Sequence, residues 1–587
     1  MLLLIFLVTA AAQVSDKNMS VVQASEIMAM IERGTPLVVY DHIIVKGDLD
    51  LNKQYYGAQS RDPSVNSSIS ILDSAVEGSV NLDNITFLRR VTFLNTTFEK
   101  AVTSRNSKFK SSAAFINSRF NKSVDFSYSI FEGSASFHGS GFGGPANFIK
   151  DVFAKSADFT ACNFANFAYF QGSILNNCQF SNTKFCSNAV FSPSDFLSDS
   201  NLSDYRQWIG FDRTVFLSKA YFRGSRFTGD VNFGDSLFND TAEFESCNFE
   251  KMSNFRESKF NQEANYARSI FQDDATFKNS RFEGTARFID SVFRRHADFT
   301  GSSFMGVADF TNASFEMRGP SDIAPTNFQG TTFNKMANFC MAKFGGDANF
   351  AYCTFHDDRS CEERSNALAS LGSRLNKCLN VIGMSLFGQP FRSASFGKAI
   401  FGGKADFQGS TIDHMIDFND ARFTKLLIKW DNIYPLDDLS NYPHFIKNYK
   451  NISWFDDASD CFYDYRVQIR NKQPLGYATK TIDFAAEKAY GYGMKPLYPL
   501  MLSLLVVLIF GFIYRRYINE SGPLLGYISF SLAVFISGTK LLGFENVSKP
   551  KERQAAIAYD VEKWLGLILQ GLIILTISKT VLDVVNM

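Results

Sequence analysis

Residues whose types and spacing could support catalysis or metal binding are sparse in this 587-residue chain. The six histidines, at positions 42, 138, 296, 356, 414 and 444, include no pair at the spacing of metal ligands. The sequence also lacks a Gly-rich phosphate loop, a nucleophile elbow, a His-Glu-x-x-His motif and a Cys-x-x-Cys pair. We therefore expect no enzyme activity and no catalytic, cofactor-binding or metal site.

The strongest cluster of acidic residues is formed by Asp456, Asp457 and Asp460. Carboxylates this close together could hold a metal ion or act as an acid and a base. The surrounding stretch, residues 445–470, carries apolar and aromatic residues at three- and four-residue spacing, which predicts one or two amphipathic helices. Because carboxylates are also favoured at the start of a helix, we interpret the cluster as a solvated helix start.

Composition argues against two classes of protein. The chain has 59 basic and 59 acidic residues and a net charge of zero, which disfavours both a basic nucleic-acid binder and a strongly acidic DNA mimic. The unusual number is phenylalanine, with 62 residues beside 4 Trp and 14 Pro. So many phenylalanines indicate a structural position for a large apolar side chain that is repeated along the chain.

The phenylalanines recur with a period of eleven residues. In the blocks SVDFSYSIFEG, SASFHGSGFGG and PANFIKDVFAK, which follow one another from Ser123, the steps between them alternate between five and six residues. The same pattern begins near Ile71, continues with interruptions to Phe315, and returns at residues 328–355 and 396–423. The elements of the fold must account for this period.

Neither an α-helix nor a flat strand explains it. On a helix of about 3.6 residues per turn, side chains five and six residues apart would point in scattered directions. A strand alternates every two residues, and alternation here lasts only for a triplet of small residue, any residue and Phe, such as Ala157-Asp158-Phe159. Residues typical of turns follow each triplet. The sequence therefore predicts a short extended side, a corner, and a repetition of both.

These triplets resemble the units of the pentapeptide-repeat family. The resemblance implies an all-β solenoid, a right-handed quadrilateral β-helix in which the central Phe or Leu and the small residue two positions earlier face inward. The six-residue steps suggest about 22 residues per coil. With its interruptions left out, the region 71–423 gives about thirteen coils and a rod of about 60 Å.

Phenylalanines one coil apart would stack as offset aromatic pairs, about 4.8 Å apart along the axis. We take the following residues as the structural ladder of the interior: Phe126, Phe137, Phe148, Phe159, Phe222, Phe233, Phe244, Phe255, Phe277, Phe288, Phe299 and Phe310.

Other side chains of the repeats are assigned from the same register. Scattered carboxylates should face outward into solvent, at Asp125, Asp158, Asp298 and Asp309. Four cysteines occupy the small inward position and are expected to be apolar fillers, namely Cys162, Cys178, Cys247 and Cys353. Outside the repeats, an external location would permit a disulfide among Cys361, Cys378 and Cys461.

The sequence predicts five parts in chain order: a signal peptide at 1–12, an N-terminal cap at 13–70, the β-helix at 71–423, a helical linker at 424–496 and a transmembrane region at 497–587. The period is lost, and loop insertions are expected, near 197–210, 317–326 and 357–391; the centre of the last could be a helix. In the cap, residues 21–34 predict a helix with Ser25 as its N-cap, and residues 43–51 alternate like a first strand.

Two C-terminal segments are apolar and long enough to cross a membrane, at residues 497–514 and about 564–585. Their cores, 497–514 and 564–577, carry no acid or base, which favours an anchor over an ion path. The segment between them, 523–543, is apolar but broken by Gly and Ser. For this segment both a third span and a re-entrant or interfacial path remain open.

The segments at 445–470 and 491–496 resemble those that follow the repeats in membrane-anchored pentapeptide-repeat proteins of methanogenic archaea. A cleaved signal peptide would place the repeats outside the cytoplasm, in the cell envelope. Arg515 and Arg516, directly after the first span, would then lie inside, as the positive-inside rule requires.

We therefore expect a non-enzymatic, membrane-anchored extracytoplasmic scaffold or binding protein. Its partner would be an unidentified protein, a cell-envelope polymer or further copies of the chain, with no nucleic acid and no cofactor. The alternative is an ion-channel-like pore fused to the repeats, because two spans enclosing residues 530–538 resemble the plan of two-span cation channels. The filter signature Thr-Val-Gly-Tyr-Gly is absent, and a cleaved signal would put the pore loop on the cytoplasmic side.

Overall fold

The computed structural model describes residues 19–56, 63–198, 208–316, 325–356, 392–495, 497–518, 522–537 and 547–585. The chain forms two compact units. Among the described residues, the solenoid unit reaches Ile428 and includes residues 432–434, and the helical unit consists of residues 429–431 and those from Pro435 onward. The predicted signal peptide, the insertion at 357–391 and two of the cysteines, Cys361 and Cys378, lie outside the described residues.

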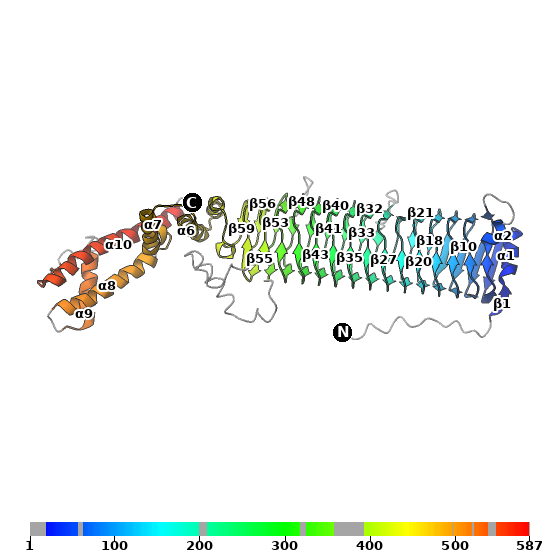
Figure 1. Ribbon diagram of the computed structural model, residues 1–587, viewed down its shortest axis with the longest axis horizontal. Helices are drawn as coiled ribbons and strands as arrows, with labels where there is room; N and C mark the ends of the chain where they lie inside the picture. The colour runs from blue at the N-terminus through cyan, green and yellow to red at the C-terminus, as the bar shows by residue number, and fades with distance from the viewer. Residues whose placement is uncertain are drawn as a thin grey trace. The chain divides into compact units, whose positions relative to one another are not determined.

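The solenoid unit consists of coils with a short strand on each of four sides. One coil contains β15 (Arg119–Phe120), β16 (Val124–Asp125), β17 (Ile130–Phe131) and β18 (Ala135–Ser136). Each strand pairs in parallel with the equivalent strand of the next coil, as Phe120 does with Phe142, 22 positions later. Figure 1 shows these coils stacked along one axis. The predicted all-β solenoid with about 22 residues per coil is confirmed.

The solenoid has more coils than the repeats alone indicated. One side contains 16 strands, from β1 (Ser20–Gln23) to β57 (Thr411–Ile412), so the expected number of about thirteen coils is wrong. Residues assigned to the cap already form coils, since β1 pairs with β3 (Ile43–Lys46) and β3 pairs with β7 (Ala75–Val76). Val and Ile fill the interior of these first coils, and the aromatic period therefore starts later than the solenoid does.

The N-terminal helix begins at a different residue from the predicted one. α1 (Ala24–Glu32) has Gln23 as its N-cap, with no side-chain hydrogen bond, so the assignment of Ser25 as N-cap is wrong. The reason is that the three residues before Ala24 are held extended by the pairing of β1 with β3. The next elements are β2 (Leu37–Asp41), β3, β4 (Leu49–Asp50), α2 (Leu51–Tyr56), β5 (Ser64–Val65) and β6 (Ser68–Leu72). The single strand predicted over 43–51 is therefore two strands and the start of a helix.

Strands extend into the edges of two predicted insertions. β28 (Asp195–Leu197) and β29 (Ile209–Gly210) border residues 198–208, and β49 (Thr326–Asn327) ends the second insertion. The last coils contain longer strands, β55 (Arg392–Ser395), β56 (Ile400–Asp406), β58 (Met415–Asp417) and β59 (Arg422–Leu427).

The alternation of five- and six-residue steps follows from two kinds of corner. Within the five-residue step from Phe126 to Phe131, Tyr128 has a φ of 66°. In the next five-residue step, Gly139 has a φ of 68°. The left-handed residue recurs two positions after every second Phe and is most often Asn, Asp or Gly, the residues that tolerate this conformation. A left-handed residue makes the tighter corner, and the wider corner takes one residue more.

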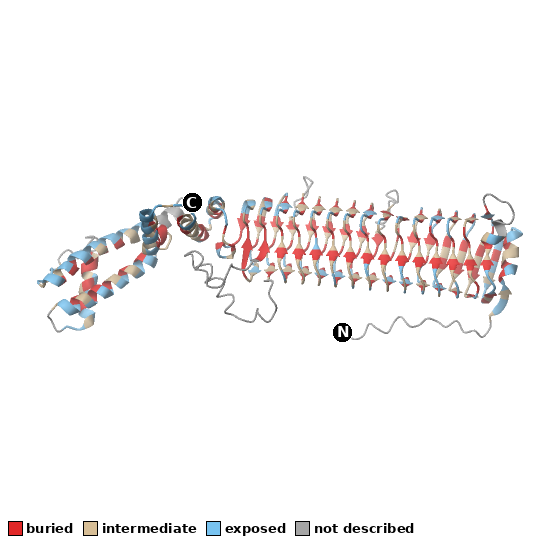
Figure 2. Ribbon diagram, in the orientation of Figure 1, coloured by how far each residue is buried: buried red, intermediate tan, exposed pale blue. Residues whose placement is uncertain are grey.

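The interior is filled by stacked aromatic rings. All twelve ladder phenylalanines named above have 0% exposure. Phe244 stacks on Phe222 at 4.9 Å and on Tyr266 at 4.8 Å, with ring planes within 2° of parallel. It also meets Phe233 from the other side of the coil edge-on, at 5.3 Å and 84°. Both arrangements are favoured by the ring quadrupole, and Figure 2 shows the buried residues as rows that run from coil to coil along the solenoid.

A column of buried hydroxyl groups lies beside the rings. In the pattern Phe-x-x-Ser-x-Phe, most serine hydroxyls donate to a carbonyl oxygen of the preceding coil, as Ser258 Oγ does to Phe233 O at 2.7 Å. Each hydroxyl can also accept a backbone N–H, as Ser129 Oγ does from Ser107 N at 3.0 Å. We call this set the serine column; it contains Ser107, Ser118, Ser129, Ser140, Ser173, Ser225, Ser236, Ser258, Ser269, Ser280, Ser291 and Ser302, each at most 1% exposed.

Three cysteines occupy the serine column. Cys247 Sγ donates to Phe222 O at 3.0 Å, and the backbone N–H of Cys247 donates to Ser269 Oγ at 3.1 Å. Cys162 and Cys353 make the equivalent thiol contact, each at 2.9 Å. Their interpretation as apolar fillers is therefore wrong, because each thiol takes the place of a hydroxyl donor. Cys178, by contrast, replaces Ala157 of the preceding coil, since Phe180 stacks on Phe159, and it is a small buried filler.

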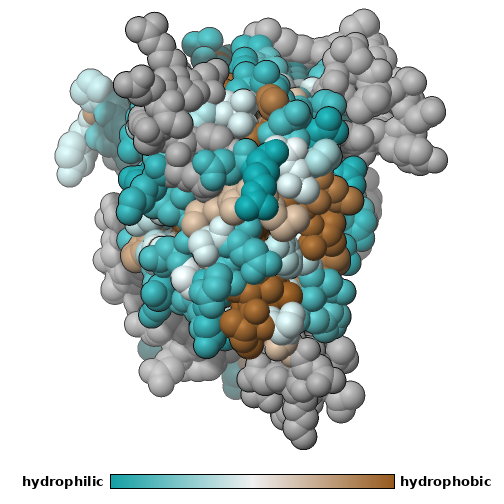
Figure 3. Space-filling model, turned by 90° about the vertical axis from the view of Figure 1, so that its right-hand side faces the viewer, coloured by the Kyte–Doolittle hydropathy of each residue, from teal (hydrophilic) through white to brown (hydrophobic). Residues whose placement is uncertain are grey.

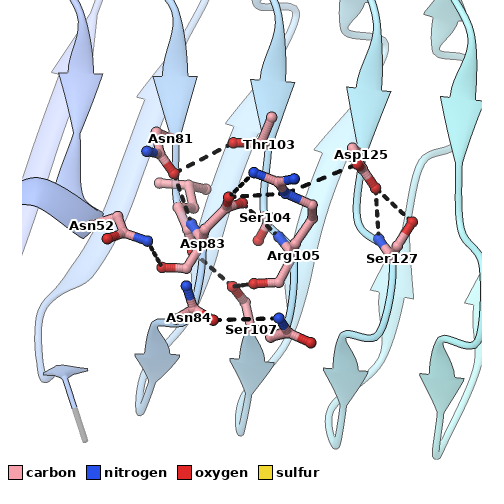
Figure 4. Close-up of polar contacts among 12 residues, drawn as sticks. Asn52, Asn81, Asp83, Asn84, Thr103, Ser104, Arg105, Ser107, Asp125 and Ser127 are labelled. Carbon is pink, nitrogen blue, oxygen red and sulfur yellow. Dashed lines mark hydrogen bonds and ion pairs between the residues drawn. The ribbon is translucent and has the colours of Figure 1, made fainter. Parts of the chain in front are cut away.

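The outward carboxylates hold corners in addition to facing solvent. Asp298 Oδ1 accepts the backbone N–H of Thr300 at 2.9 Å, and Asp309, Asp158 and Asp125 make the same contact two residues on. Figure 4 shows this for Asp125 and Ser127, together with the ion pair of Arg105 and Asp83 at 2.7 Å. Such contacts are typical of turns begun by Asp.

The N-terminal end of the solenoid presents the edges of its first strands. β1 and β2 are terminal in their sheets, and their outward residues Val21, Leu37 and Val39 are 54%, 61% and 49% exposed. Figure 3 views this end, where apolar patches are separated by polar side chains.

The helical unit contains six α-helices among its described residues: α5 (Tyr442–Asn451), α6 (Phe455–Lys472), α7 (Tyr477–Tyr490), α8 (Leu497–Tyr517), α9 (Leu524–Ser537) and α10 (Arg553–Val585). The helices predicted within 445–470 are thus two, α5 and α6. A short 3₁₀ helix, η4 (Gly491–Gly493), connects α7 toward α8.

Candidate functional site

The helices α8, α9 and α10 pack against one another and include the segments that the sequence assigned to a membrane. α8 and α10 are long and apolar enough to cross one, over Leu497–Tyr517 and Arg553–Ser578. The sequence placed the start of the second span near residue 564, because Asp560, Glu562 and Lys563 interrupt the apolar run. The helix nevertheless begins at Arg553.

Over its described residues, α9 is shorter than a membrane span. Its 14 residues extend about 21 Å, whereas the hydrocarbon core of a bilayer is about 30 Å thick. Residues before it, Gly522 and Pro523, and residues after it, 548–552, line one pocket. The chain therefore enters and leaves at the same end of the α8–α10 pair. This arrangement is the one expected of the re-entrant or interfacial path left open above.

Two glycines let the helices approach closely. A Cβ atom on Gly566 would lie 2.3 Å from the Phe535 carbonyl oxygen, and one on Gly511 would lie 2.9 Å from Ile528 Cγ1. Phe535 O also accepts a hydrogen bond from Gln570 Nε2 at 2.6 Å. Small residues and interhelical hydrogen bonds are the usual means of association of helices in lipid.

The centre of this bundle holds a carboxyl group, Glu562, which is 0% exposed. Tyr514 Oη donates to Glu562 Oε2 at 2.6 Å. Ser531 Oγ contacts the other carboxyl oxygen and lies 2.8 Å from the carbonyl oxygen of Val507. One residue from each of three helices thus meets at this site.

The number of protons available to these hydrogen bonds indicates the protonation state of Glu562. A serine hydroxyl carries one proton, so Ser531 cannot donate both to the carboxyl group and to Val507 O. If Glu562 keeps its own proton, it donates to Ser531 Oγ, Ser531 donates to Val507 O, and Tyr514 donates to the remaining carboxyl oxygen. This neutral form satisfies every contact and avoids a buried charge without a partner.

The predicted cores, 497–514 and 564–577, carry no acid or base, but the second apolar helix begins earlier than predicted and therefore includes Glu562. The sequence left Glu562 two positions outside the predicted core. Tyr514, Ser531 and Glu562 lie 17 and 31 residues apart, at no spacing that a motif search recognises. Only the re-entrant path of α9 brings Ser531 between the other two.

A second polar cluster precedes α8. Arg470, 8% exposed, contacts Asp483 at 3.4 Å, Glu487 at 2.5 Å and Tyr492 Oη at 3.1 Å. Burial opposes the charge on Glu487, but hydrogen bonds and charges from Lys488 and Arg470 outweigh it and lower the pKa of this carboxyl. These contacts join α6, α7 and η4, so the cluster fixes the approach to α8 and pairs its buried charges with one another.

The three carboxylates singled out in the sequence do not converge. Asp457 is buried and accepts hydrogen bonds from Trp430 N at 2.7 Å and Lys429 Nζ at 3.0 Å. Asp460 pairs with Lys495, and Asp456 lies in the first turn of α6. The interpretation of a solvated helix start is wrong for Asp457, because its carboxylate ties the helix to the chain that precedes it.

One group of potential metal ligands was missed because the coil brings it together. Among the described residues, Asp41, His42 and Asp73 offer ligand atoms within 4.8 Å of one another. His42 Nδ1 lies 2.7 Å from Asp41 Oδ1, and both side chains are more than half exposed. An exposed ion pair of this kind is ordinary at a protein surface.

Comparison with known proteins bears on the solenoid unit. Residues 105–150, 211–259 and 266–314 match the family model described as pentapeptide repeats (9 copies). The chain contains pentapeptide repeats. No curated protein and no solved structure matches it. The pentapeptide-repeat matches include eleven of the twelve ladder phenylalanines, all but Phe159. They leave out the helical unit, whose role must be argued from its own geometry.

Proposed function

We propose that this protein is a non-enzymatic scaffold, anchored in a membrane by α8 and α10, that displays its pentapeptide-repeat solenoid outside the cytoplasm. The observation that carries the proposal is the outward apolar surface of the two long helices. Phe512, Trp564 and Leu575 are 56%, 67% and 53% exposed. Of the most apolar stretches of α8 and α10, only 33% and 22% is buried.

Lipid is the solvent that suits this surface. A core helix of a soluble protein would be mostly buried, and apolar side chains left in water at this density would cost free energy in proportion to their area. In a bilayer the same side chains face hydrocarbon, while the polar groups of Glu562, Ser531 and Tyr514 satisfy one another inside the bundle.

The solenoid supports a binding role more than a chemical one. Its interior is occupied by stacked rings and buried hydroxyl groups, so a partner would meet its outer faces. An unidentified protein, a cell-envelope polymer or another copy of the chain would suit such an extended surface. The resemblance to membrane-anchored proteins of methanogenic archaea and the signal-like N-terminus support a location in the cell envelope.

Two measurements on the full chain test this proposal. The protein should stay in the membrane fraction after washing at high pH and leave it only in detergent. Protease added to intact cells should remove the solenoid. Release by the alkaline wash would contradict the anchor, and a protease-protected solenoid in cells whose other surface proteins are cleaved would contradict the location.

A pore is the second candidate, and the re-entrant path of α9 favours it. A short helix that enters and leaves at one end, between two spans, is the plan expected of a two-span channel. Reconstituted in liposomes, the scaffold should give no cation flux above empty vesicles. Cation-selective flux that disappears when residues 535–539 are changed would replace the scaffold by the pore.

A further inference from the structure

A pocket of about 620 Å³ opens at the end of the bundle where α8 stops and α9 begins. Its apolar wall includes Ile518, Pro523, Tyr527 and Phe530. Its polar rim includes Lys549 and Lys551, on the segment that leads into α10. The pocket thus combines an apolar wall with ammonium groups.

The charges around this pocket are unbalanced. Arg515 and Arg516 lie in the last turn of α8, within one turn of Ile518, and Arg553 starts α10 directly after the rim. Among the described residues, neither these arginines nor Lys551 has an ion pair or a side-chain hydrogen bond, and all four are exposed. Lys549 is neutralised by Asp560, and Glu552 is the carboxylate on the rim. Among the described residues at this end, four unpaired cations therefore lie on or next to the segments that line the pocket, beside one half-buried carboxylate, Glu552.

The pocket also lies where lipid headgroups would be. The apolar surface of α8 ends at Arg515 and Arg516, and Tyr517, 40% exposed, follows them. On α10, Trp564 is 67% exposed at the corresponding end of the apolar run. Tyr and Trp beside Arg and Lys mark the level of the membrane interface.

We propose that this pocket binds an anionic phospholipid. The phosphate is held by Lys551 with Arg515, Arg516 and Arg553, and the start of one acyl chain lies against Tyr527 and Phe530. A free anion would satisfy the cations but would leave the apolar wall in water, whereas a phospholipid satisfies both. Basic pockets between membrane helices suit anionic headgroups. This inference rests on the membrane anchor proposed above.

Native mass spectrometry of the full chain in detergent tests it. Dioleoyl phosphatidylglycerol should remain bound and should be preferred to dioleoyl phosphatidylcholine. The triple variant R515Q/R516Q/K551Q should weaken phosphatidylglycerol binding about 100-fold, since each basic residue near a membrane surface contributes a factor of about five. The control variant K122Q/K155Q/K251Q removes three exposed lysines of the solenoid and should bind as the parent does.

A second variant separates the shape of the pocket from its charge. A side chain at Gly526 would meet nothing within 4 Å of its Cβ, so Gly526→Trp should fill the pocket without disturbing the packing. It should lose phosphatidylglycerol with all four cations intact. Equal binding of both lipids, an unchanged G526W variant, or displacement of the lipid by an equal concentration of inorganic phosphate would each overturn the proposal. If the protein stays in alkaline-washed membranes but shows no lipid preference, only this site fails; if it is released, the anchor itself fails.

Discussion

The two units bury polar groups in different ways. In the solenoid, most hydroxyl groups of the serine column donate to a carbonyl oxygen of the preceding coil, as Ser280 Oγ does to Phe255 O. In the helical unit, Glu562, Tyr514 and Ser531 meet once, on three helices, with no repetition. A structural position that recurs at a fixed period is found by comparing the sequence with itself, whereas a polar cluster that occurs once leaves no repeated pattern in the sequence.

The difference also predicts how each unit responds to change. A substitution in the solenoid interior should disturb only the adjoining coils, because each coil contacts only its neighbours. A substitution at Glu562 affects α8, α9 and α10 at once, because its carboxyl group contacts residues of the other two helices.

The largest effect is expected at Phe244, in the middle of the longest regular block. Phe244→Asp places a carboxylate between Phe222 and Tyr266 with no partner, which should cost about 4 kcal/mol or more. Phe244→Leu keeps most of the apolar volume and should cost about 1.5 kcal/mol. Thermal unfolding followed by the β signal in circular dichroism distinguishes them. A Phe244→Asp protein that melts like the parent would disprove the inward register.

The next effect concerns Glu562. Glu562→Ala removes the partner of Tyr514 and Ser531 and leaves a cavity, which should cost about 3 kcal/mol. Glu562→Gln keeps the shape, because the amide group can donate to Ser531 Oγ and its oxygen can accept from Tyr514. It should therefore unfold within about 0.5 kcal/mol of the parent in detergent. A large loss for Glu562→Gln, close to that of Glu562→Ala, would show that the carboxyl group is ionised in the folded protein.

The sequence predicted the solenoid because its evidence is repeated. The alternation of five and six residues between phenylalanines required a coil of about 22 residues. The serine column was equally visible, since the pattern Phe-x-x-Ser-x-Phe occurs in FRESKF, FKNSRF and FTGSSF. It was missed because serine was classed only as small, and its hydroxyl was not assigned a partner.

The sequence could not predict the polar cluster of Glu562, Tyr514 and Ser531, and the reason is physical. Glu562 is followed by Lys563 and preceded by Asp560, which on composition alone indicates a solvated helix end. Its burial depends on α9 folding back beside α8, and no local preference encodes that path. The burial of Asp457 under Trp430 was hidden in the same way, since the contact joins residues 27 positions apart.

An exception inside the periodic unit gives a pH-dependent prediction. Asp151 occupies the serine column, is 0% exposed, and accepts Ser129 N at 2.8 Å with one carboxyl oxygen, while the other oxygen has no partner. Burial raises the pKa of Asp151 well above its ordinary value, against a smaller opposing effect of the Ser129 N–H group. The folded protein therefore holds this proton more tightly than the unfolded chain does.

The sign of the effect follows from that difference. Asp151 contributes its full stability below the unfolded pKa of about 3.9, and this contribution is lost as the pH rises toward the raised pKa of the folded state. Asp151→Ser restores the usual hydroxyl and should be more stable than the parent by about 2 kcal/mol at pH 8, with a smaller difference at pH 4. Melting temperatures at the two pH values measure this. An equal difference at both values would mean that the pKa of Asp151 is the same in the folded and the unfolded protein.

The smallest effects test whether the solenoid distinguishes two positions that both look small in the sequence. Cys247 lies in the serine column and donates to Phe222 O at 3.0 Å, whereas Cys178 lies at an alanine position. Cys247→Ser should therefore be tolerated within about 0.5 kcal/mol, and Cys247→Ala should cost about 1 kcal/mol because it leaves a buried carbonyl oxygen short of a donor. The order should reverse at Cys178, where alanine is neutral and serine buries a hydroxyl group without a partner at a cost of about 1 kcal/mol.

Because both thiols are fully buried, burial raises the pKa of Cys247 to about 12 and that of Cys178 as well. Neither thiol should therefore react with an alkylating reagent at pH 8 while the protein is folded. Thermal unfolding of the four single variants decides the matter: the same preference at both sites would mean that the serine column is only a row of small side chains, and opposite preferences would show that its hydrogen bonds stabilise the coils.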